Sequence, residues 1–178
     1  MEDNKEPGEK TARLRAKVHL ERGRHYFNVN RFEEALAALE ESIASDPEYV
    51  RAYTAKANTL AMLGRPEEAI TICDEIIVKN PTFALAYTTR ASALHRAGRP
   101  TEAADNYRRG IESAPDEHLT HYNFACFWAL EGNEEECEKY LRRALELEPR
   151  SKPKAATDDD FASVRGKEWF QNLVAFGR

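Results

Sequence analysis

The chain of 178 residues has few cysteines, no long apolar run and no excess of positive charge. Its three cysteines, Cys73, Cys126 and Cys137, are an odd number without CxxC spacing, which excludes a disulfide framework and the common zinc motifs. No apolar run approaches the roughly 20 residues that cross a bilayer, and the charged N-terminal segment does not form a secretory signal. We therefore expect free thiols, a cytoplasmic location and no membrane span.

The balance of charge argues against nucleic-acid binding. The chain has 26 Lys and Arg against 31 Asp and Glu, a net charge of −5, whereas proteins that bind phosphate backbones carry an excess of basic residues. Hydrophobic residues make up 42% of the chain, which is enough for a packed interior. Glycine-rich phosphate loops and the HExxH and GxSxG motifs are missing. We expect no enzyme, no catalytic residue and no cofactor.

Two groups of potential metal ligands have simpler structural explanations. His118, His121 and Cys126 lack a fourth ligand, and His121 falls at a position that packs between helices. The triplet 158–160 is predicted to supply the acidic capping charge of a helix N-terminus, because three adjacent carboxylates do not converge on one ion. The sequence therefore predicts no metal site.

What the chain does contain is a repeat of 34 residues. Prolines recur at this spacing without an insertion, at Pro47, Pro81, Pro115 and Pro149. Small residues keep the same phase, at Gly23, Ala57, Ala91 and Ala125 and again at Ala35, Ala69, Ala103 and Cys137. Large apolar residues do the same, at Tyr26, Leu60, Leu94 and Trp128. This period is the length of one helix-turn-helix unit in a helical repeat array.

Each unit is predicted to form two antiparallel helices. The first helix ends at a residue that tolerates a left-handed backbone, which is Asn30, Gly64, Gly98 or Gly132. Pro66 and Pro100 open second helices, where a proline sacrifices no intrahelical hydrogen bond. The two helices of a unit are expected to approach most closely at Ala57 and Ala69, where a larger side chain would overpack the contact.

The phased residues resemble the tetratricopeptide repeat, with Tyr53 and Tyr87 at the aromatic position of the unit, small residues at its helix contacts and proline near its end. The matching units cover residues 16–49, 50–83, 84–117 and 118–151. The resemblance implies an all-α fold, a right-handed superhelical solenoid of antiparallel helix-turn-helix repeats. It also implies a scaffold that binds other proteins.

The two ends of the chain fall outside the repeat. Residues 1–11 are polar and without periodicity, and we expect them to form a flexible tail. Residues 152–178 contain the apolar positions Phe161, Val164, Trp169, Phe170 and Leu173, which predict capping helices that cover the last unit. The order of Asp160, Phe161, Arg165 and the Trp169–Phe170 pair is also similar to the closing segment of many bacterial tetratricopeptide repeat proteins.

The resemblance implies where a partner binds, because first helices in this family line a concave groove. The corresponding residues are Lys17, Leu20, Arg24, Phe27, Arg51, Thr54, Asn58, Leu85, Thr88, Ser92, His95 and Tyr122. The charged residues in this set are all basic, which favours a partner segment with acidic character. The cationic clamp by which related co-chaperones hold heat-shock chaperones is not matched, since only Arg24 of its five positions is basic here.

The leading hypothesis is a non-enzymatic adaptor that binds a segment of a partner protein in this groove. A second hypothesis is a self-assembling scaffold that forms homo-oligomers. A third is a regulatory subunit with a redox-sensitive thiol at Cys126, which we predict to be more accessible than the other two cysteines because it lies one residue beyond the tight contact at Ala125.

Overall fold

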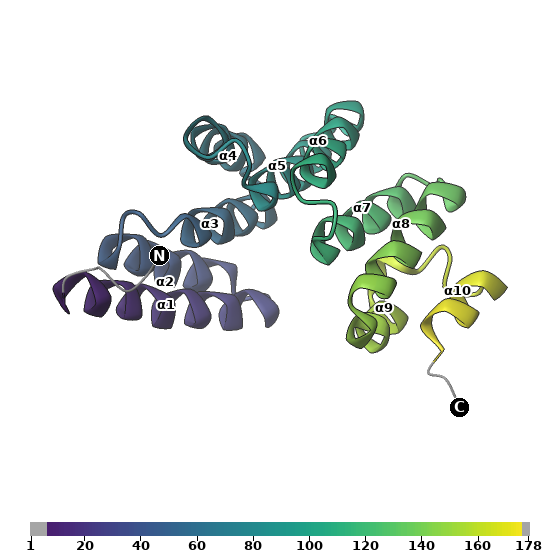
Figure 1. The fold of residues 1–178 in the computed structure, drawn as a ribbon, viewed down its shortest axis with the longest axis horizontal. Helices are drawn as coiled ribbons and strands as arrows, with labels where there is room; N and C mark the ends of the chain where they lie inside the picture. The colour runs from purple at the N-terminus through teal and green to yellow at the C-terminus, as the bar shows by residue number, and fades with distance from the viewer. Residues whose placement is uncertain (1–6, 176–178) are drawn as a thin grey trace.

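A computed structural model describes residues 7–175, and these residues form helices in sequential antiparallel pairs (Figure 1). Figure 1 shows the pairs following one another along an arched array, with α1 and α10 at opposite ends. The elements are α1 Pro7–Asn28, α2 Phe32–Ser45, α3 Val50–Met62, α4 Pro66–Lys79, α5 Ala84–Arg96, α6 Pro100–Ser113, α7 His118–Leu130, α8 Glu134–Leu147, η1 Pro149–Ser151, α9 Lys152–Thr157, η2 Asp159–Phe161 and α10 Glu168–Val174.

The turn inside each unit has the same backbone geometry four times. The four predicted turn residues all have positive φ, at 59° for Asn30, 75° for Gly64 and 74° for Gly98 and Gly132. In the second unit the N–H of Arg65 then donates to the carbonyl of Leu60 at 2.9 Å, which satisfies one of the carbonyls at the end of α3. Pro66 and Pro100 begin α4 and α6. The four predicted turns and the predicted starts of α4 and α6 are confirmed.

The contact between the two helices of a unit is built on small residues. Ala57 of α3 and Ala69 of α4 are both 0% exposed and belong to one hydrophobic cluster. In the first unit the approach is closer still, because a Cβ atom placed on Gly23 would lie 2.7 Å from Cγ of Leu39 and 3.3 Å from the carbonyl oxygen of Ala35. The close approach predicted from the small residues is confirmed.

Helix α1 begins earlier than the sequence predicts. We expected a tail over residues 1–11, but α1 already starts at Pro7, and residues 1–6 lie outside the described part of the chain. A proline at the first helical position costs no hydrogen bond. The guanidinium of Arg13 also pairs with Asp46 at 2.6 Å and lies 4.7 Å from the ring centroid of Tyr49, which ties this end of α1 to the α2–α3 turn.

The C-terminal segment, described as far as residue 175, covers the last pair of helices. Phe161, Val164 and Phe170 are buried at 0%, 4% and 1% exposure, in one cluster with apolar residues of α7 and α8. Polar contacts fix the segment at its edges, where the indole N–H of Trp169 donates to Glu134 at 2.8 Å and the hydroxyl of Ser163 donates to the carbonyl of Ala129 at 3.1 Å. Among the described residues, no helix combines the length and apolar character of a membrane span.

The small contact residues lead to a stability prediction. Ala69→Leu should lower the free energy of unfolding by about 1–3 kcal/mol, because the added volume has no space between α3 and α4. The same change at the exposed Ala37 of α2 should stay within about 0.5 kcal/mol. Urea denaturation followed by circular dichroism compares the two variants. Equal unfolding midpoints would contradict the helix pairing described here.

The buried C-terminal segment leads to a second stability prediction. Phe161→Ala should cost about 3–5 kcal/mol, because it leaves a cavity where a fully buried ring fills the space beside α7. Leu130→Ala removes a side chain that is 55% exposed and should cost less than about 0.5 kcal/mol. Thermal unfolding of both variants measures the difference. A Phe161→Ala protein as stable as Leu130→Ala would show that the segment does not support the last unit.

Candidate functional site

Two open pockets lie along the first helices of the units. The N-terminal pocket has a volume of about 470 Å³ and is lined by Glu21, Gly23, Arg24, Phe27, Asn28, Leu39, Arg51, Thr54, Ala55, Asn58, Thr59, Leu85, Leu119 and Asn123. These residues include members of α1, α3, α5 and α7, so the four first helices surround one common concavity. This concave face is where the sequence predicts a partner.

The C-terminal pocket is smaller, at about 210 Å³, and continues along the same face. It is lined by Ser92, His95, Arg96, Tyr107, Asn123, Cys126, Phe127, Leu130 and Asp160. Asn123 lines both pockets, which places them side by side. Asp160 comes from the C-terminal segment, so that segment forms part of the wall of the concave face.

Eight of the twelve predicted groove residues line one of the two pockets. Six of them line the N-terminal pocket, namely Arg24, Phe27, Arg51, Thr54, Asn58 and Leu85. Ser92 and His95 line the C-terminal pocket. Lys17 is exposed but lines neither pocket.

Four predicted groove residues that occupy the same position of successive units, and so form one column, are buried. Leu20, Thr54, Thr88 and Tyr122 recur at the same position of the unit and are 1%, 2%, 1% and 2% exposed. The hydroxyl of Thr88, for example, lies 2.9 Å from that of Thr120 and so joins α5 to α7. Leu20, Thr88 and Tyr122 line neither pocket, so the structure does not bring them into the groove. Thr54 does line the N-terminal pocket, although it is almost fully buried. The hydroxyl of Tyr122 donates to Asp158 of the C-terminal segment.

The charge of the concave face is also less one-sided than the sequence predicts. Glu21 lines the N-terminal pocket and pairs with Arg24 at 3.3 Å between Oε1 and Nη1. His95 Nε2 lies 2.9 Å from the carboxylate of Glu131. Arg51 forms no ion pair with any residue that the structure describes. Arg51 is therefore the basic side chain in the N-terminal pocket that is free to meet an acidic partner group.

Asn123 and Glu21 were missed as lining residues, although the repeat contains the signal that finds them. Both belong to one column at 34-residue spacing, which also contains Ala55, and these three members line the N-terminal pocket. Once one member of this column is known to line the pocket, the 34-residue spacing points to the other two. Neither Asn58 nor Asn123 uses its side-chain amide in a hydrogen bond within residues 7–175, so both amides can pair with a ligand.

The three cysteines are buried free thiols. Cys73 and Cys137 are 0% exposed, and burial raises the pKa of each to about 12. Cys126 is only 7% exposed, and burial, followed by the nearby Asp160 and Asp158, raises its pKa well above the usual range. A redox-sensitive thiol needs access and thiolate character. Cys126 is thus more exposed than the other two cysteines, as predicted, but it is still a buried thiol with a raised pKa, and its redox role stays a prediction.

The two histidines near Cys126 have structural partners. His121 is 5% exposed, and its Nε2 lies 2.8 Å from the carbonyl oxygen of Pro115. His118 lies beside Glu117, with 3.7 Å between Nδ1 and the carboxylate. Neither histidine belongs to a cluster of metal-ligand groups in the described part of the chain. Packing and loop contacts thus account for both, as the sequence indicated.

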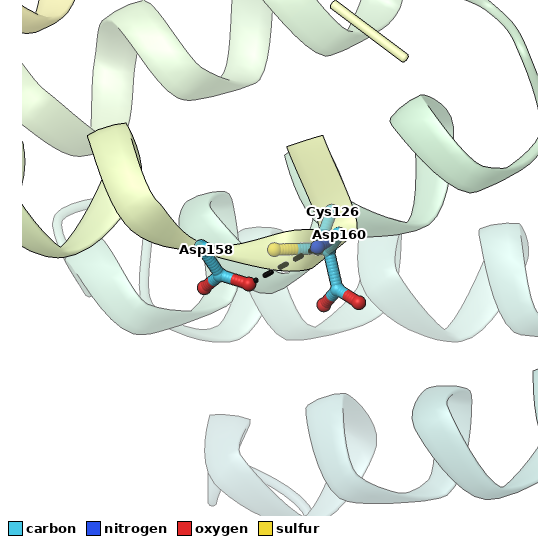
Figure 2. A group of neighbouring side chains, drawn as sticks. All are labelled: Cys126, Asp158 and Asp160. Carbon is cyan, nitrogen blue, oxygen red and sulfur yellow. Dashed lines mark hydrogen bonds between the residues drawn. The ribbon is translucent and has the colours of Figure 1, made fainter. Parts of the chain in front are cut away.

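The acidic triplet divides into two roles. Asp158 caps the short helix η2, since its carboxylate accepts a hydrogen bond from the N–H of Asp160 at 3.2 Å, which confirms the predicted capping. Asp159 points to solvent and pairs with Arg165 at 3.6 Å. Asp158 and Asp160, however, lie together with Cys126, and one potential ligand atom from each lies within 4.8 Å of the other two (Figure 2). The sequence did not place Cys126 beside this triplet.

Comparison with known proteins agrees with the repeat. One model of the tetratricopeptide repeat matches residues 20–84, and another matches residues 84–117 and 120–151. No curated protein sequence matches the chain.

Solved structures with the same arrangement of helices come from several organisms. A thermophilic tetratricopeptide repeat protein of Thermus thermophilus matches with a TM-score of 0.70 at 19% identity, over 89% of this chain and 86% of that chain. The first such domain of human RPAP3 has a TM-score of 0.55 at 21% identity, over 76% and 96%. MamA of Desulfovibrio magneticus RS-1 has a TM-score of 0.54 at 14% identity, over 76% of each chain. At these identities the likeness shows the fold alone.

The burial of the thiols leads to a prediction of their reactivity. At pH 8, where a free cysteine with a pKa near 8.5 is partly thiolate, the folded protein should react with Ellman's reagent far more slowly than free cysteine does. In denaturant all three thiols should react at once. The release of thionitrobenzoate measures both. Rapid reaction of one thiol in the folded protein, lost in Cys126→Ser, would support the regulatory role for Cys126.

Proposed function

The chain belongs to the tetratricopeptide repeat family, whose members generally serve as protein–protein interaction modules, and we propose that it is a non-enzymatic adaptor. Its partner binds as an extended segment along the concave face. The observation that carries this proposal is the N-terminal pocket, which brings side chains of all four first helices together around about 470 Å³.

The lining of the pocket supports a peptide ligand. Phe27, Leu85 and Leu119 provide apolar surface, and Leu119 is 42% exposed. Asn58 and Asn123 present amides that can both donate to and accept from a peptide backbone. Apolar contact with a few polar groups that fix orientation is the usual chemistry of a binding pocket.

The charge of the pocket supports a partner segment with an acidic residue. Arg51 is free and Arg24 is only loosely held by the exposed Glu21, so an incoming carboxylate meets two cationic groups against one anionic group. Such charges act mainly on the rate of encounter and on the choice of partner. An acidic residue beside Arg51 would set the register of the bound segment.

A catalytic role has no support in the same face. A cysteine nucleophile needs a lowered pKa or an adjacent base, whereas burial raises the pKa of all three thiols. His95, the histidine that lines a pocket, already faces the carboxylate of Glu131.

Charge reversal tests the assignment of the binding face. The variant with Arg24→Glu and Arg51→Glu should lose several-fold in binding, because two attractive contacts become repulsive. The effect should shrink from 0.1 M to 1 M salt, as the Debye length falls from about 10 Å to about 3 Å. Affinity capture from a lysate of the source cells, quantified by mass spectrometry, measures which proteins each variant retains.

A matched control lies on α6. Arg108 pairs with the residue three positions before it, as Arg24 does, and its neighbour Arg109 has no ion pair in the described part of the chain, like Arg51. Neither lines a pocket. If Arg108→Glu with Arg109→Glu loses the partner and the pocket variant keeps it, binding takes place on the outer face. Sedimentation of the wild type tests the alternative of self-assembly, which predicts a mass that grows with concentration.

A further inference from the structure

The C-terminal end of the concave face holds a group of side chains that partner binding does not explain. Cys126 projects from α7, and Asp158 and Asp160 come from the segment that follows the last unit (Figure 2). The thiol and one oxygen of each carboxylate all lie within 4.8 Å of one another. The ligand atoms of a tetrahedral ion lie about 3.3–3.8 Å apart, since each metal–ligand bond is about 2.0–2.3 Å long. Small side-chain rotations would therefore bring these three atoms onto one ion.

Asp158 is held in place within this group by two hydrogen bonds. The hydroxyl of Tyr122 donates to Oδ2 of Asp158 at 2.8 Å, and the N–H of Asp160 donates to Oδ1 at 3.2 Å. Tyr122 is 2% exposed, and its ring meets that of Phe161 edge-on at 5.6 Å. The hydroxyl of Tyr122 therefore reaches the carboxylate from a ring that is packed and buried. Hydrogen bonds of this kind orient the carboxylates of metal sites.

The ligand atoms of the group suit a divalent transition-metal ion. Two carboxylates and one buried thiol supply three ligand atoms of the kinds that such ions take in proteins.

The C-terminal pocket gives an ion room and access. Cys126 is more than nine-tenths buried, yet both Cys126 and Asp160 line this pocket of about 210 Å³. Ser92 and Asn123 line it as well and can hydrogen-bond water. The pocket is therefore the place for the water ligands that complete the coordination of an ion held by three protein groups.

We propose that Cys126, Asp158 and Asp160 form a binding site for a divalent transition-metal ion, with Zn²⁺ as the ion whose ligand preference fits best. Zn²⁺ accepts sulfur and carboxylate oxygen together, whereas Mg²⁺ and Ca²⁺ select oxygen alone. On binding, the Cys126 thiol gives its proton to solvent and the metal–sulfur bond forms, with no change of oxidation state. The ion would join α7 to the C-terminal segment at the wall of the concave face.

Cobalt(II) provides a direct spectroscopic test on the full chain. Titration with Co²⁺ should produce a near-ultraviolet thiolate-to-cobalt charge-transfer band that saturates at one equivalent. Zn²⁺ should then displace Co²⁺ and remove the band, because a thiolate is a soft ligand that selects Zn²⁺. The absence of a charge-transfer band would overturn the proposal.

Three variants decide which side chains bind the ion. Cys126→Ser should abolish the band, because Cys73 and Cys137 lie outside the cluster. Asp160→Asn keeps the thiol and should weaken Co²⁺ binding at least about tenfold. Asp159→Asn, the matched control, changes the adjacent side chain that points to solvent and should leave binding unchanged.

The same variants carry the outcomes that contradict the site. A band that survives in Cys126→Ser would assign the sulfur ligand to another cysteine. If Asp159→Asn and Asp160→Asn weaken Co²⁺ binding equally, the loss comes from the general negative charge of this surface, and Asp160 is not a ligand. Circular dichroism confirms that each variant is folded, and if Cys126→Ser does not fold, the comparison of the two aspartate variants decides alone.

Discussion

The close approach of the two helices within each unit is the contact on which the remaining structure depends. It leaves no room for a side chain at Gly23, where even a Cβ atom would meet Leu39 at 2.7 Å, and it buries Ala57 and Ala69 completely. Interiors packed at this density resist both added and removed volume. Each hairpin is consequently a block of fixed shape. Because successive blocks must meet in the same way, the period of 34 residues recurs without an insertion from Pro47 to Pro149.

Stacking of these blocks then assigns one environment to each column of residues. The column of Leu20, Thr54, Thr88 and Tyr122 lies between units, and its threonines satisfy their hydroxyls with local carbonyls, as Thr54 does with Arg51 at 3.0 Å. One turn further along the first helices, the column of Arg24, Asn58, Ser92 and Cys126 faces the pockets. Packing dictates the first column and leaves the second free to vary. The chemistry of the concave face therefore changes from basic, to amide, to hydroxyl and thiol along one groove.

The same distinction explains what the sequence could predict. Periodicity located the helices, the positive-φ turns at Asn30 and the three glycines, and the small residues of the helix contacts, because each depends on interactions within a unit. Periodicity could not tell which positions of a first helix are buried and which face the groove. Positions of both kinds recur every 34 residues, and the pattern does not say which way a side chain points. Individual ion pairs, such as that of Arg24 with Glu21 in place of an unopposed basic rim, depend on rotamers that no repeat specifies. The pairing of Arg13 with Asp46, which ties the N-terminal part of α1 to the α2–α3 turn, is likewise not specified by the repeat.

The end of the repeat is where prediction from periodicity fails most clearly. A fifth first helix would bury Tyr122 and cover the apolar side of α8 with residues of the same columns. The C-terminal segment, which lacks the 34-residue period, does this with Phe161, Val164 and Phe170. It also brings carboxylates next to α7. Asp158 caps η2 and accepts a hydrogen bond from Tyr122, so the packing of the C-terminal segment on the last unit uses a carboxylate at this position. The same part of the segment brings Asp158 and Asp160 beside Cys126. Cys126 is the thiol-bearing member of the pocket-facing column that begins at Arg24. The segment that covers the end of the array thus also determines which chemical groups lie beside Cys126 in the last unit.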